Sequence, residues 1–340
     1  MATAPLDVVG IGNAIVDVIV QADDAFLAEH GMVKSAMTLI DEPRAQALYA
    51  AIGARRDQKP GDTKIIEASG GSAANTVAGI ASLGGRAAFI GKVRRDLLGD
   101  VFARDLGKLG VAFDSAPATE GPATGQCLVV VTPDAHRTMN TFLGAGASLG
   151  VEDVAPEAVA AAQIVYLEGY LFDPPAAQAA FRKAADIAHA HHRKVALSLS
   201  DSFCVERHRE AFLGLIDGRV DIVFANEAEA LSLFQTQDID EAVRQLRDLA
   251  PLATVTRGPK GAIVLSAGET IEVPAASVSQ VVDTTGAGDL YAAGFLTNYT
   301  RNAPLAECGR LGCLAAAEII SHFGARAETP LTDYVAVRRL

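Results

Sequence analysis

The stretch Asp283-Thr284-Thr285-Gly286-Ala287-Gly288-Asp289 decides how this chain is interpreted, because it joins a turn of small residues to a carboxylate at an expected helix start. The apolar, β-branched run 278–282 predicts a strand or a buried extended segment before it, and 290–298 predicts a helix after it. Glycine lets the backbone approach an anion closely, and the first N–H groups of a helix lack intrahelical partners. The turn therefore predicts a phosphate site, with Asp289 beside it as a general base.

A purely structural alternative is that Gly-Ala-Gly lets a helix pack tightly on a strand, with Asp283 or Asp289 as a cap. Two aspartates, two threonines and two glycines within seven positions favour the site instead. The segment resembles the C-terminal signature of the ribokinase-like carbohydrate kinases, the PfkB family. In that family the last Asp is the catalytic base and the turn, here Gly286, Ala287 and Gly288, is the anion hole. The resemblance implies a phosphotransferase with an alcohol group as acceptor, which uses ATP and Mg²⁺.

Composition bounds the class of protein. The chain has 340 residues, of which 50% are hydrophobic, so it can bury a sizeable core. Its formal net charge of −12 argues against broad contact with nucleic acid or acidic membranes. No apolar run approaches the ~18 residues of a membrane span, and residues 1–7 lack a basic region before an apolar stretch. We expect a cytoplasmic protein whose partners are small molecules, with four reduced cysteines.

Strand-like runs alternate with Ala-rich helical segments, which predicts βαβ units and a mainly parallel sheet covered on both faces. The expected strands are 164–167, 194–199, 221–224, 254–256 and 262–265, and the expected helices include 174–192 and 238–249. The N-terminal third has short strand candidates without a helix after each, at 17–20, 38–40, 64–67 and 125–132. The resemblance implies one ribokinase-like catalytic unit over 1–340, a three-layer α/β/α domain with a small β-sheet lid. The lid is expected within 13–42, 62–69 and 111–142, and the large domain from the remainder.

Two N-terminal segments suggest an acceptor site. Gly70-Gly71-Ser72-Ala73-Ala74-Asn75 follows a strand candidate and opens an Ala-rich helix, and it resembles the N-terminal signature of the family. On its own it could be a glycine turn with a Ser cap. Asn13 and Asp17 follow the expected strand at Val8-Val9, and a carboxamide with a carboxylate matches the vicinal hydroxyls of a furanose. A purely structural alternative is that Asn13 lies in a turn and that Asp17 is a strand residue that faces solvent.

The residue patterns of these segments are more similar to those of adenosine kinases than to those of other members of the family. Besides Gly-Asn-x-x-x-Asp and Gly-Gly-Ser-x-x-Asn, the stretches 197–203 and Thr124-Gly125-Gln126-Cys127 resemble segments of those enzymes. The resemblance implies phosphorylation of the 5′-hydroxyl of a nucleoside, adenosine to AMP, with Asn13, Asp17, Gly70, Gly71, Ser72, Asn75 and Cys127 around the acceptor. A sugar kinase like ribokinase or fructokinase is the alternative within the family. Met37 and Thr38 differ from the vertebrate adenosine kinases, which leaves base selectivity open.

Further residues complete the expected nucleotide side. Asn226 and Glu229 follow the strand at 220–224 and would share a helix face, which suits hydrated Mg²⁺, although an Asn cap with Glu at its third helical position fits the same spacing. The turn Thr256-Arg257-Gly258-Pro259-Lys260-Gly261 resembles the nucleotide loop of the family. The resemblance assigns Asn226, Thr256, Gly258, Gly261, Asp283 and Thr285 to ATP and Arg137, on the lid, to the transferred phosphate. A monovalent cation such as K⁺ would be sought at 283–285.

Other site classes are disfavoured. His189, His191 and His192 crowd a helix end, where imidazoles are favoured anyway, and no carboxylate or Cys spacing completes a metal set. Ile15 stands where a dinucleotide fold needs its third glycine, which disfavours an NAD-dependent oxidoreductase. A nucleoside-binding module that has lost catalysis is disfavoured because Asp289 is intact.

Overall fold

The computed structural model describes residues 6–58, 65–134 and 136–338, and the strands in this part of the chain form two sheets. The larger sheet has the order β14-β13-β12-β11-β10-β9-β1-β5-β6. It is parallel from β12 to β6 and antiparallel at β12-β13-β14. Its strands are β1 (Leu6–Ile11), β5 (Ala87–Ile90), β6 (Val111–Ala112), β9 (Ala162–Glu168), β10 (Lys194–Ser198), β11 (Ile222–Asn226), β12 (Leu252–Thr256), β13 (Ala262–Ser266) and β14 (Glu269–Val273).

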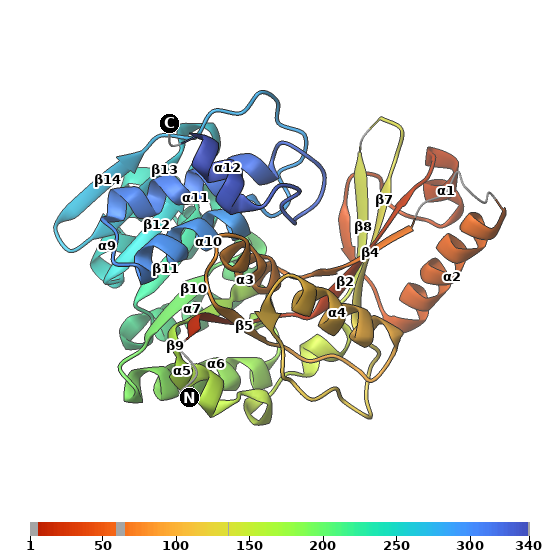
Figure 1. The fold of residues 1–340 in the computed structure, drawn as a ribbon, viewed down its shortest axis with the longest axis horizontal. Coiled ribbons are helices and arrows are strands. Elements are labelled where there is room, and N and C mark those ends of the chain that lie inside the picture. Colours follow the sequence, from red (N-terminus) through yellow and green to blue (C-terminus); the bar gives the residue numbers. More distant parts are fainter. Residues whose placement is uncertain (1–5, 59–64, 135, 339–340) are drawn as a thin grey trace.

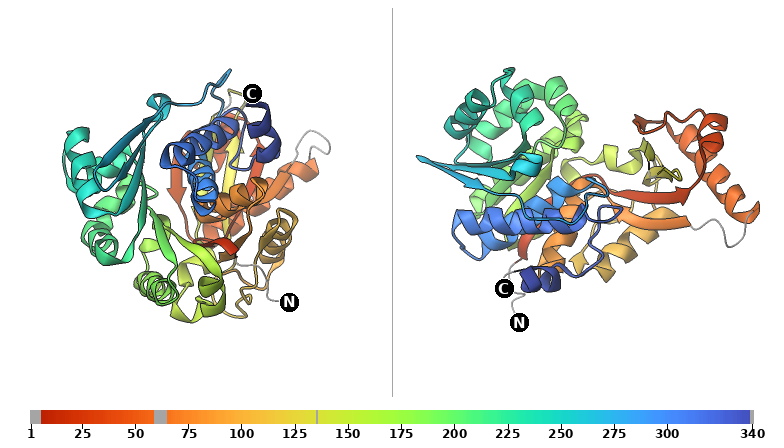
Figure 2. Two further views of the ribbon diagram at one scale, coloured as in Figure 1. Left: turned by 60° about the vertical axis from the view of Figure 1, so that its left-hand side comes forward. Right: turned by 90° about the horizontal axis from the view of Figure 1, so that it is seen from above.

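Two helical layers enclose the larger sheet (Figures 1 and 2). One layer has α3 (Ser72–Ser82), α4 (Leu97–Lys108), α10 (Ala287–Thr300), α11 (Leu305–Ile319) and α12 (Leu331–Arg338), and the other has α5 (Pro156–Ala161), α6 (Pro175–Ala190), α7 (Ser202–Arg219), α8 (Glu227–Phe234) and α9 (Ile239–Leu249). Alternate residues of β9 supply the two cores: Ile164 and Tyr166 pack with the first layer, whereas Val165 and Leu167 pack with the second. Apolar side chains on both faces are typical of a parallel strand that is buried on both sides.

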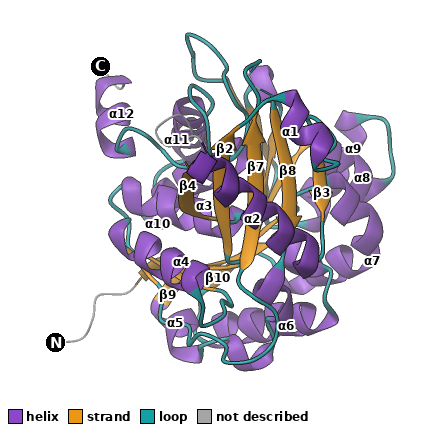
Figure 3. Ribbon diagram, turned by 90° about the vertical axis from the view of Figure 1, so that its right-hand side faces the viewer, coloured by secondary structure: helices purple, strands orange, loops and turns teal. Residues whose placement is uncertain are grey.

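The smaller sheet stands beside this domain and has the order β3-β8-β7-β2-β4 (Figure 1). Its strands are β2 (Ile15–Gln21), β3 (Met37–Leu39), β4 (Ile65–Gly70), β7 (Gly125–Val131) and β8 (Arg137–Phe142). Helices α1 (Asp24–Glu29) and α2 (Glu42–Gln58) cover its outer face, as Figure 3 shows. Val18, Leu128 and Val130 of the sheet share a core with Phe26 and Leu48 of these helices.

The expected fold class, a three-layer α/β/α domain with a small additional sheet, is confirmed. Two details differ from expectation. Helix α2 belongs to the small sheet and not to the large domain, because its buried Leu48 and Ile52 have their apolar partners there. Residues 62–64 of the expected lid lie outside the described part of the chain.

The prediction of a strand or a buried extended segment at 278–282 is wrong. These residues form an irregular loop that is largely exposed, and Val281 keeps 55% of its surface accessible. The edge of the larger sheet at this end is β14, which pairs with β13, and residues 278–282 add no strand to that edge. Near its end the loop is joined to the C-terminus of α11, since Val282 N and Asp283 N donate to Ile320 O at 2.8 and 3.4 Å.

Candidate active site

The anion turn, Gly286–Gly288, lies where the loop after β14 enters α10. Gly286 is the N-cap residue with φ of 78°, and a Cβ added to it would lie 2.9 Å from Ala325 Cβ. Ala287 N donates to Thr284 O at 3.2 Å. A Cβ added to Gly288 would meet nothing within 4 Å. Because the N–H groups of a first helical turn have no acceptor within the helix, this open side of the turn suits an anion.

Asp289 lies in the first turn of α10 and is held by the start of α3. Its carboxylate accepts hydrogen bonds from Ser72 Oγ at 2.6 Å and from Asn75 Nδ2 at 2.9 Å. Burial raises the pKa of Asp289, against the opposing effects of these two donors and of the Arg326 charge. The two glycine-containing segments identified in the sequence therefore meet at one carboxylate.

Asn13, Asp17, Gly70 and Gly71 also lie together. A Cβ added to Gly70 would fall 2.6 Å from Asp17 Oδ2, and one added to Gly71, whose φ is 97°, would fall 2.2 Å from Asn13 O. Both glycines are required for this close approach. Burial raises the pKa of Asp17 to about 6, although the charges of Arg326 and Arg137 act to lower it.

Glu168, at the carboxyl end of β9, holds Asn13 and the start of α3. Its Oε1 accepts from Asn13 Nδ2 at 2.8 Å, and its Oε2 accepts from Ala73 N at 2.8 Å. Burial raises the pKa of Glu168 to about 7, against these hydrogen bonds. Asn13 Oδ1 is buried and has no hydrogen-bond partner among the described residues. That orphaned acceptor is available to a hydroxyl group of a ligand.

The inner face of the small sheet is the face that carries Asp17, Cys127 and Arg137, since alternate strand residues share a side. Cys127 pairs in register with Asp17, and Thr141 Oγ1 donates to its sulfur at 3.3 Å. Burial and the Asp17 charge raise the pKa of Cys127 to about 12. The next row across the face consists of Met37, Met139, Val129, Ile19 and Ile66. We call this row of five residues the apolar shelf, and it lies beside Asp17 and Cys127, which were expected to contact the acceptor.

Arg137 and Asp283 connect the small sheet to the anion turn. Arg137 Nη1 is paired with the Asp283 carboxylate, which also accepts from Thr285 Oγ1 at 2.7 Å and Gly324 N at 3.0 Å. Burial alone would raise the pKa of Asp283, but the Gly324 and Thr285 donors and the Arg137 charge lower it overall. Arg137 was expected to contact the transferred phosphate and Asp283 to bind ATP, and here the two side chains are paired with each other.

The nucleotide residues expected from the sequence line up at the carboxyl ends of two strands. Asn226 pairs in register with Thr256 where β11 and β12 end, and ligands of open α/β sheets bind at this edge. Gly258 and Gly261 follow in a short 3₁₀ turn with φ of 55° and 87°. A Cβ on Gly261 would lie 2.0 Å from Val273 O, so this glycine is needed to pack the turn on β14.

Asn226 and Glu229 form a capping box. Asn226 Nδ2 donates to Glu229 Oε1 at 2.6 Å, Asn226 N donates to Oε2 at 3.0 Å, and Glu229 N donates back to Asn226 Oδ1 at 2.9 Å. Burial raises the pKa of Glu229 to about 7. Among the described residues no group of three or more His, Cys, Asp or Glu side chains could hold a metal ion. This capping box is the structural alternative that the sequence left open; the pair does not form a protein cage, and it would contact a hydrated Mg²⁺ only through the waters of the ion.

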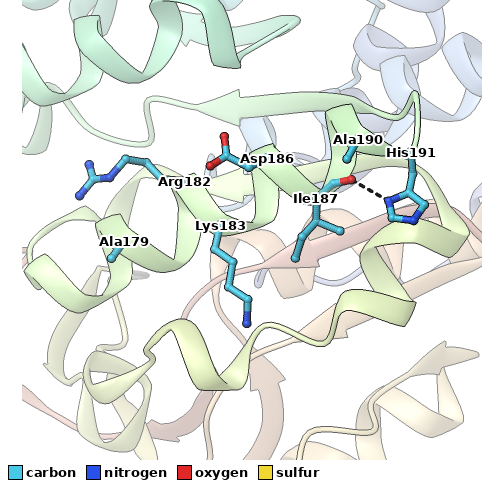
Figure 4. A pocket seen from close by; sticks show the side chains of 7 residues that line it. All are labelled: Ala179, Arg182, Lys183, Asp186, Ile187, Ala190 and His191. Carbon is cyan, nitrogen blue, oxygen red and sulfur yellow. Dashed lines mark hydrogen bonds between the residues drawn. The ribbon is translucent and has the colours of Figure 1, made fainter.

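A separate surface hollow lies on the outer side of α6 and shares no residue with this site (Figure 4). Two of its side chains are used by the fold itself, since Lys183 Nζ donates to Val151 O at 2.6 Å and His191 Nδ1 lies 3.0 Å from Ile187 O. None of the helices in the part of the chain that the structure describes has the length and apolar content of a membrane span.

Two residues at the site, Glu168 and Arg326, were not identified from the sequence. Glu168 directly follows the strand predicted at 164–167, at the edge where ligands bind, and that position was a usable signal. Arg326 lies in the irregular segment after α11, far from any motif, and no sequence pattern indicates it.

Comparison with known proteins matches residues 54–332 to the family described as pfkB family carbohydrate kinase. A solved adenosine kinase from Sinorhizobium meliloti is 49% identical, with 99% of both chains covered and a TM-score of 0.87. A solved probable sugar kinase from Rhizobium etli CFN 42 is 46% identical, also over 99% of both chains, with a TM-score of 0.88. The cytidine kinase of Thermococcus kodakarensis is 43% identical over 119 residues, which are 34% of this chain and 42% of that protein.

Proposed function

Because the chain belongs to the pfkB family of carbohydrate kinases, we propose that it transfers the γ-phosphoryl group of ATP to the 5′-hydroxyl of a nucleoside, with adenosine as the preferred acceptor. It is a phosphotransferase that acts on an alcohol group. The observation that carries the proposal is the position of Asp289, which Ser72 and Asn75 hold beside the open anion turn.

In the proposed reaction, Asp289 accepts the proton of the acceptor hydroxyl as that oxygen attacks the γ-phosphorus. The bond to the β-phosphate oxygen breaks, and ADP leaves. Amides at Gly286–Gly288 stabilise the negative charge on the transferring group. The raised pKa of Asp289 supports this role, since it brings the carboxylate closer to a useful proton affinity near neutral pH. Bound Mg²⁺ would neutralise phosphate charge, with Asn226 and Glu229 contacting its waters.

The acceptor nucleoside would lie against the inner face of the small sheet, beside Asn13, Asp17 and the start of α3. Asp17 can accept hydrogen bonds from ribose hydroxyls, and the unpaired Asn13 Oδ1 offers one more oxygen for such a hydrogen bond. Glu168 keeps the Asn13 side chain in place through the bond to Nδ2. The apolar shelf, with Met139 and Ile66, would receive the base, which a free sugar lacks. This surface favours a nucleoside over a sugar.

Arg137 would move from Asp283 to the transferred phosphate when ATP binds. Its guanidinium matches phosphate oxygens bidentately, and the ATP charge competes with the single Asp283 carboxylate for it. Thr256, Gly258 and Gly261 would line the nucleotide side. Closure of the small sheet over the acceptor would exclude water and so limit hydrolysis of ATP.

The test is an ADP-release assay with adenosine, inosine, guanosine, cytidine, ribose, fructose and fructose 6-phosphate. We expect the highest kcat/KM with adenosine. Higher kcat/KM with ribose or fructose would replace the nucleoside with a sugar acceptor, and higher kcat/KM with cytidine would change the base.

The same assay tests whether Asp289 is the general base. Asp289→Asn should lower kcat by about 10²–10⁴-fold, the usual contribution of a general base, with ATP binding nearly unchanged. Asp221→Asn is a matched control, because this carboxylate serves the fold by accepting from Val195 N at 2.8 Å. Undiminished turnover in Asp289→Asn would remove Asp289 from the role of base.

A further inference from the structure

The segment Gly324–Arg326, which follows α11, contacts both halves of the site. Gly324 N donates to Asp283 Oδ2 at 3.0 Å, and Ala325 packs against the positive-φ residue Gly286. Arg326 reaches the other way, to the end of β4 and the start of α3. Three consecutive residues thus join the anion turn to the segment that holds Asp289.

The Arg326 guanidinium acts as a clamp on that segment. Its Nε and Nη2 donate to Ser69 O at 3.1 and 2.8 Å, and its Nη1 donates to Ala74 O at 2.7 Å. Ser69 and Ala74 flank the glycine loop and Ser72. The planar guanidinium holds three nitrogens in fixed directions toward the two carbonyls, a geometry that the single nitrogen of lysine does not reproduce.

Ser69 is itself fixed by α4. Asp105 Oδ2 accepts from Ser69 N at 2.8 Å and from Ser69 Oγ at 2.7 Å, and Ser69 Oγ accepts from Arg326 Nη2 at 3.0 Å. Ser69 is 1% exposed, whereas Asp105 and Arg326 are partly buried. Arg326 therefore links the start of α3 to Ser69, which Asp105 of α4 holds in turn.

The second contribution of Arg326 is its charge. Burial lowers its pKa to about 10, which still leaves the group protonated at neutral pH. Its positive charge acts on Asp17, Asp105 and Asp289. Other charged or titratable groups that act electrostatically with Asp289 are Asp17 on β2, Tyr166 and Glu168 on β9, Tyr170 after β9, and Glu229 on α8. All of these other groups are acidic side chains, whereas Arg326 is a cation.

We propose that Arg326 is a positioning residue for phosphoryl transfer, which fixes Ser72 and Asn75 against Asp289 and supplies the positive charge that offsets the acidic groups around them. This inference rests on the proposed function. A purely structural role would affect stability alone. The proposed role also changes the protonation of Asp289, because loss of a nearby positive charge favours the neutral acid.

Two substitutions separate the clamp from the charge. Arg326→Gln removes the charge, so the acidic limb of the pH profile of kcat/KM should move to higher pH, with kcat at the optimum about tenfold lower. Arg326→Lys keeps the charge but loses the fork, so the limb should stay near its wild-type position while kcat falls. Arg301→Gln is the matched control, because Arg301 Nη2 also donates to a backbone carbonyl, Leu83 O at 3.0 Å, away from the site.

A second readout does not need turnover. The carboxyl carbons of aspartate are followed by NMR in ¹³C-labelled protein from pH 4 to 9, and Asp289→Asn identifies the resonance of Asp289. We expect Asp289 to titrate at higher pH in Arg326→Gln than in the wild type, and unchanged in Arg301→Gln. The proposal is overturned if Asp289 titrates identically in the wild type and Arg326→Gln. Failure of the proposed function is a different result, in which the wild type phosphorylates none of the acceptors.

Discussion

At the residue scale, Gly286 and Gly288 are two positions apart, yet the fold itself requires only the first. Gly286 has φ of 78° and would bring a Cβ against Ala325, whereas Gly288 has open space where a Cβ would be. We expect Gly286→Ala to lower stability by at least about 1–2 kcal/mol, the cost of a left-handed residue. Thermal denaturation measures this loss.

Gly288→Ala should behave in the opposite way. Alanine is a better helix former by up to about 1 kcal/mol, so the variant should be as stable as the wild type or more so. Its methyl group would occupy the space assigned to the phosphate, and misplacing reacting groups by about 1 Å can cost about 100-fold in rate. Steady-state kinetics with ATP test this. Full activity in Gly288→Ala would place the anion elsewhere.

Asp17 gives the site a pH-dependent cost in stability. Burial raises its pKa from 3.8 to about 6, so the folded protein binds this proton more tightly than the unfolded chain does. Stability is therefore lost as the pH rises from 3.8 to about 6, and the loss is complete above that range. Asp17→Asn carries no charge to bury, and should be more stable than the wild type above pH 6 by about 2–3 kcal/mol.

The measurement is urea denaturation of both proteins at pH 4.5 and pH 8. The advantage of Asp17→Asn should be larger at pH 8, while KM for the acceptor should rise because a ribose contact is lost. An equal advantage at both pH values would show that the Asp17 charge is not penalised in the folded state. Unchanged KM would count against Asp17 as an acceptor residue.

At the scale of elements, the inner face of the small sheet determines what can be bound beside Asp17. Met139 lies in the apolar shelf between Met37 and Val129, and it is in register with both. Met139→Ala should raise KM for adenosine about tenfold, the equivalent of about 1.4 kcal/mol of lost apolar contact. Leu97→Ala is the control, since Leu97 is 66% exposed on α4. An unchanged KM in Met139→Ala would move the base away from this shelf.

Elements with a strong local pattern were predictable from the sequence. The strand expected at 164–167 is β9, and the helix expected at 174–192 is α6, where Ala177, Ala180, Ala184 and Ala188 lie at helical spacing and are fully buried. The segment 278–282 has the composition of a strand but pairs with no strand of either sheet. Pairing partners are a tertiary property, so composition alone gave the wrong answer there.

The same distinction applies to the site. Asp289, Ser72 and Asn75 were identifiable because they lie in dense glycine-containing motifs at helix starts, and the structure brings them within hydrogen-bond distance. Arg326 contacts Ser69 from 257 positions away along the chain. A contact between such distant residues leaves no local pattern, and only the fold reveals it.

At the scale of the whole molecule, one continuous core joins the two sheets. The cluster that contains Ile164 and Phe224 of the large sheet also contains Val18 and Leu128 of the small sheet, and Ile52 of α2. Buried apolar contact is the main source of cooperativity in folding, so the small sheet should not unfold as a separate domain. Loss of packing beneath α2 should then weaken the whole molecule.

Ile52→Ala tests this, because Ile52 is 1% exposed between α2 and the small sheet. The substitution should cost about 2–5 kcal/mol through lost burial and the cavity left behind. Calorimetry should show one transition displaced to lower temperature. Leu246→Ala is the control, since Leu246 is fully buried in the other core, on α9, and should also displace a single transition. A separate low-temperature transition in Ile52→Ala alone would instead make the small sheet an independent unit, whose closure over the acceptor could be altered without changing the large domain.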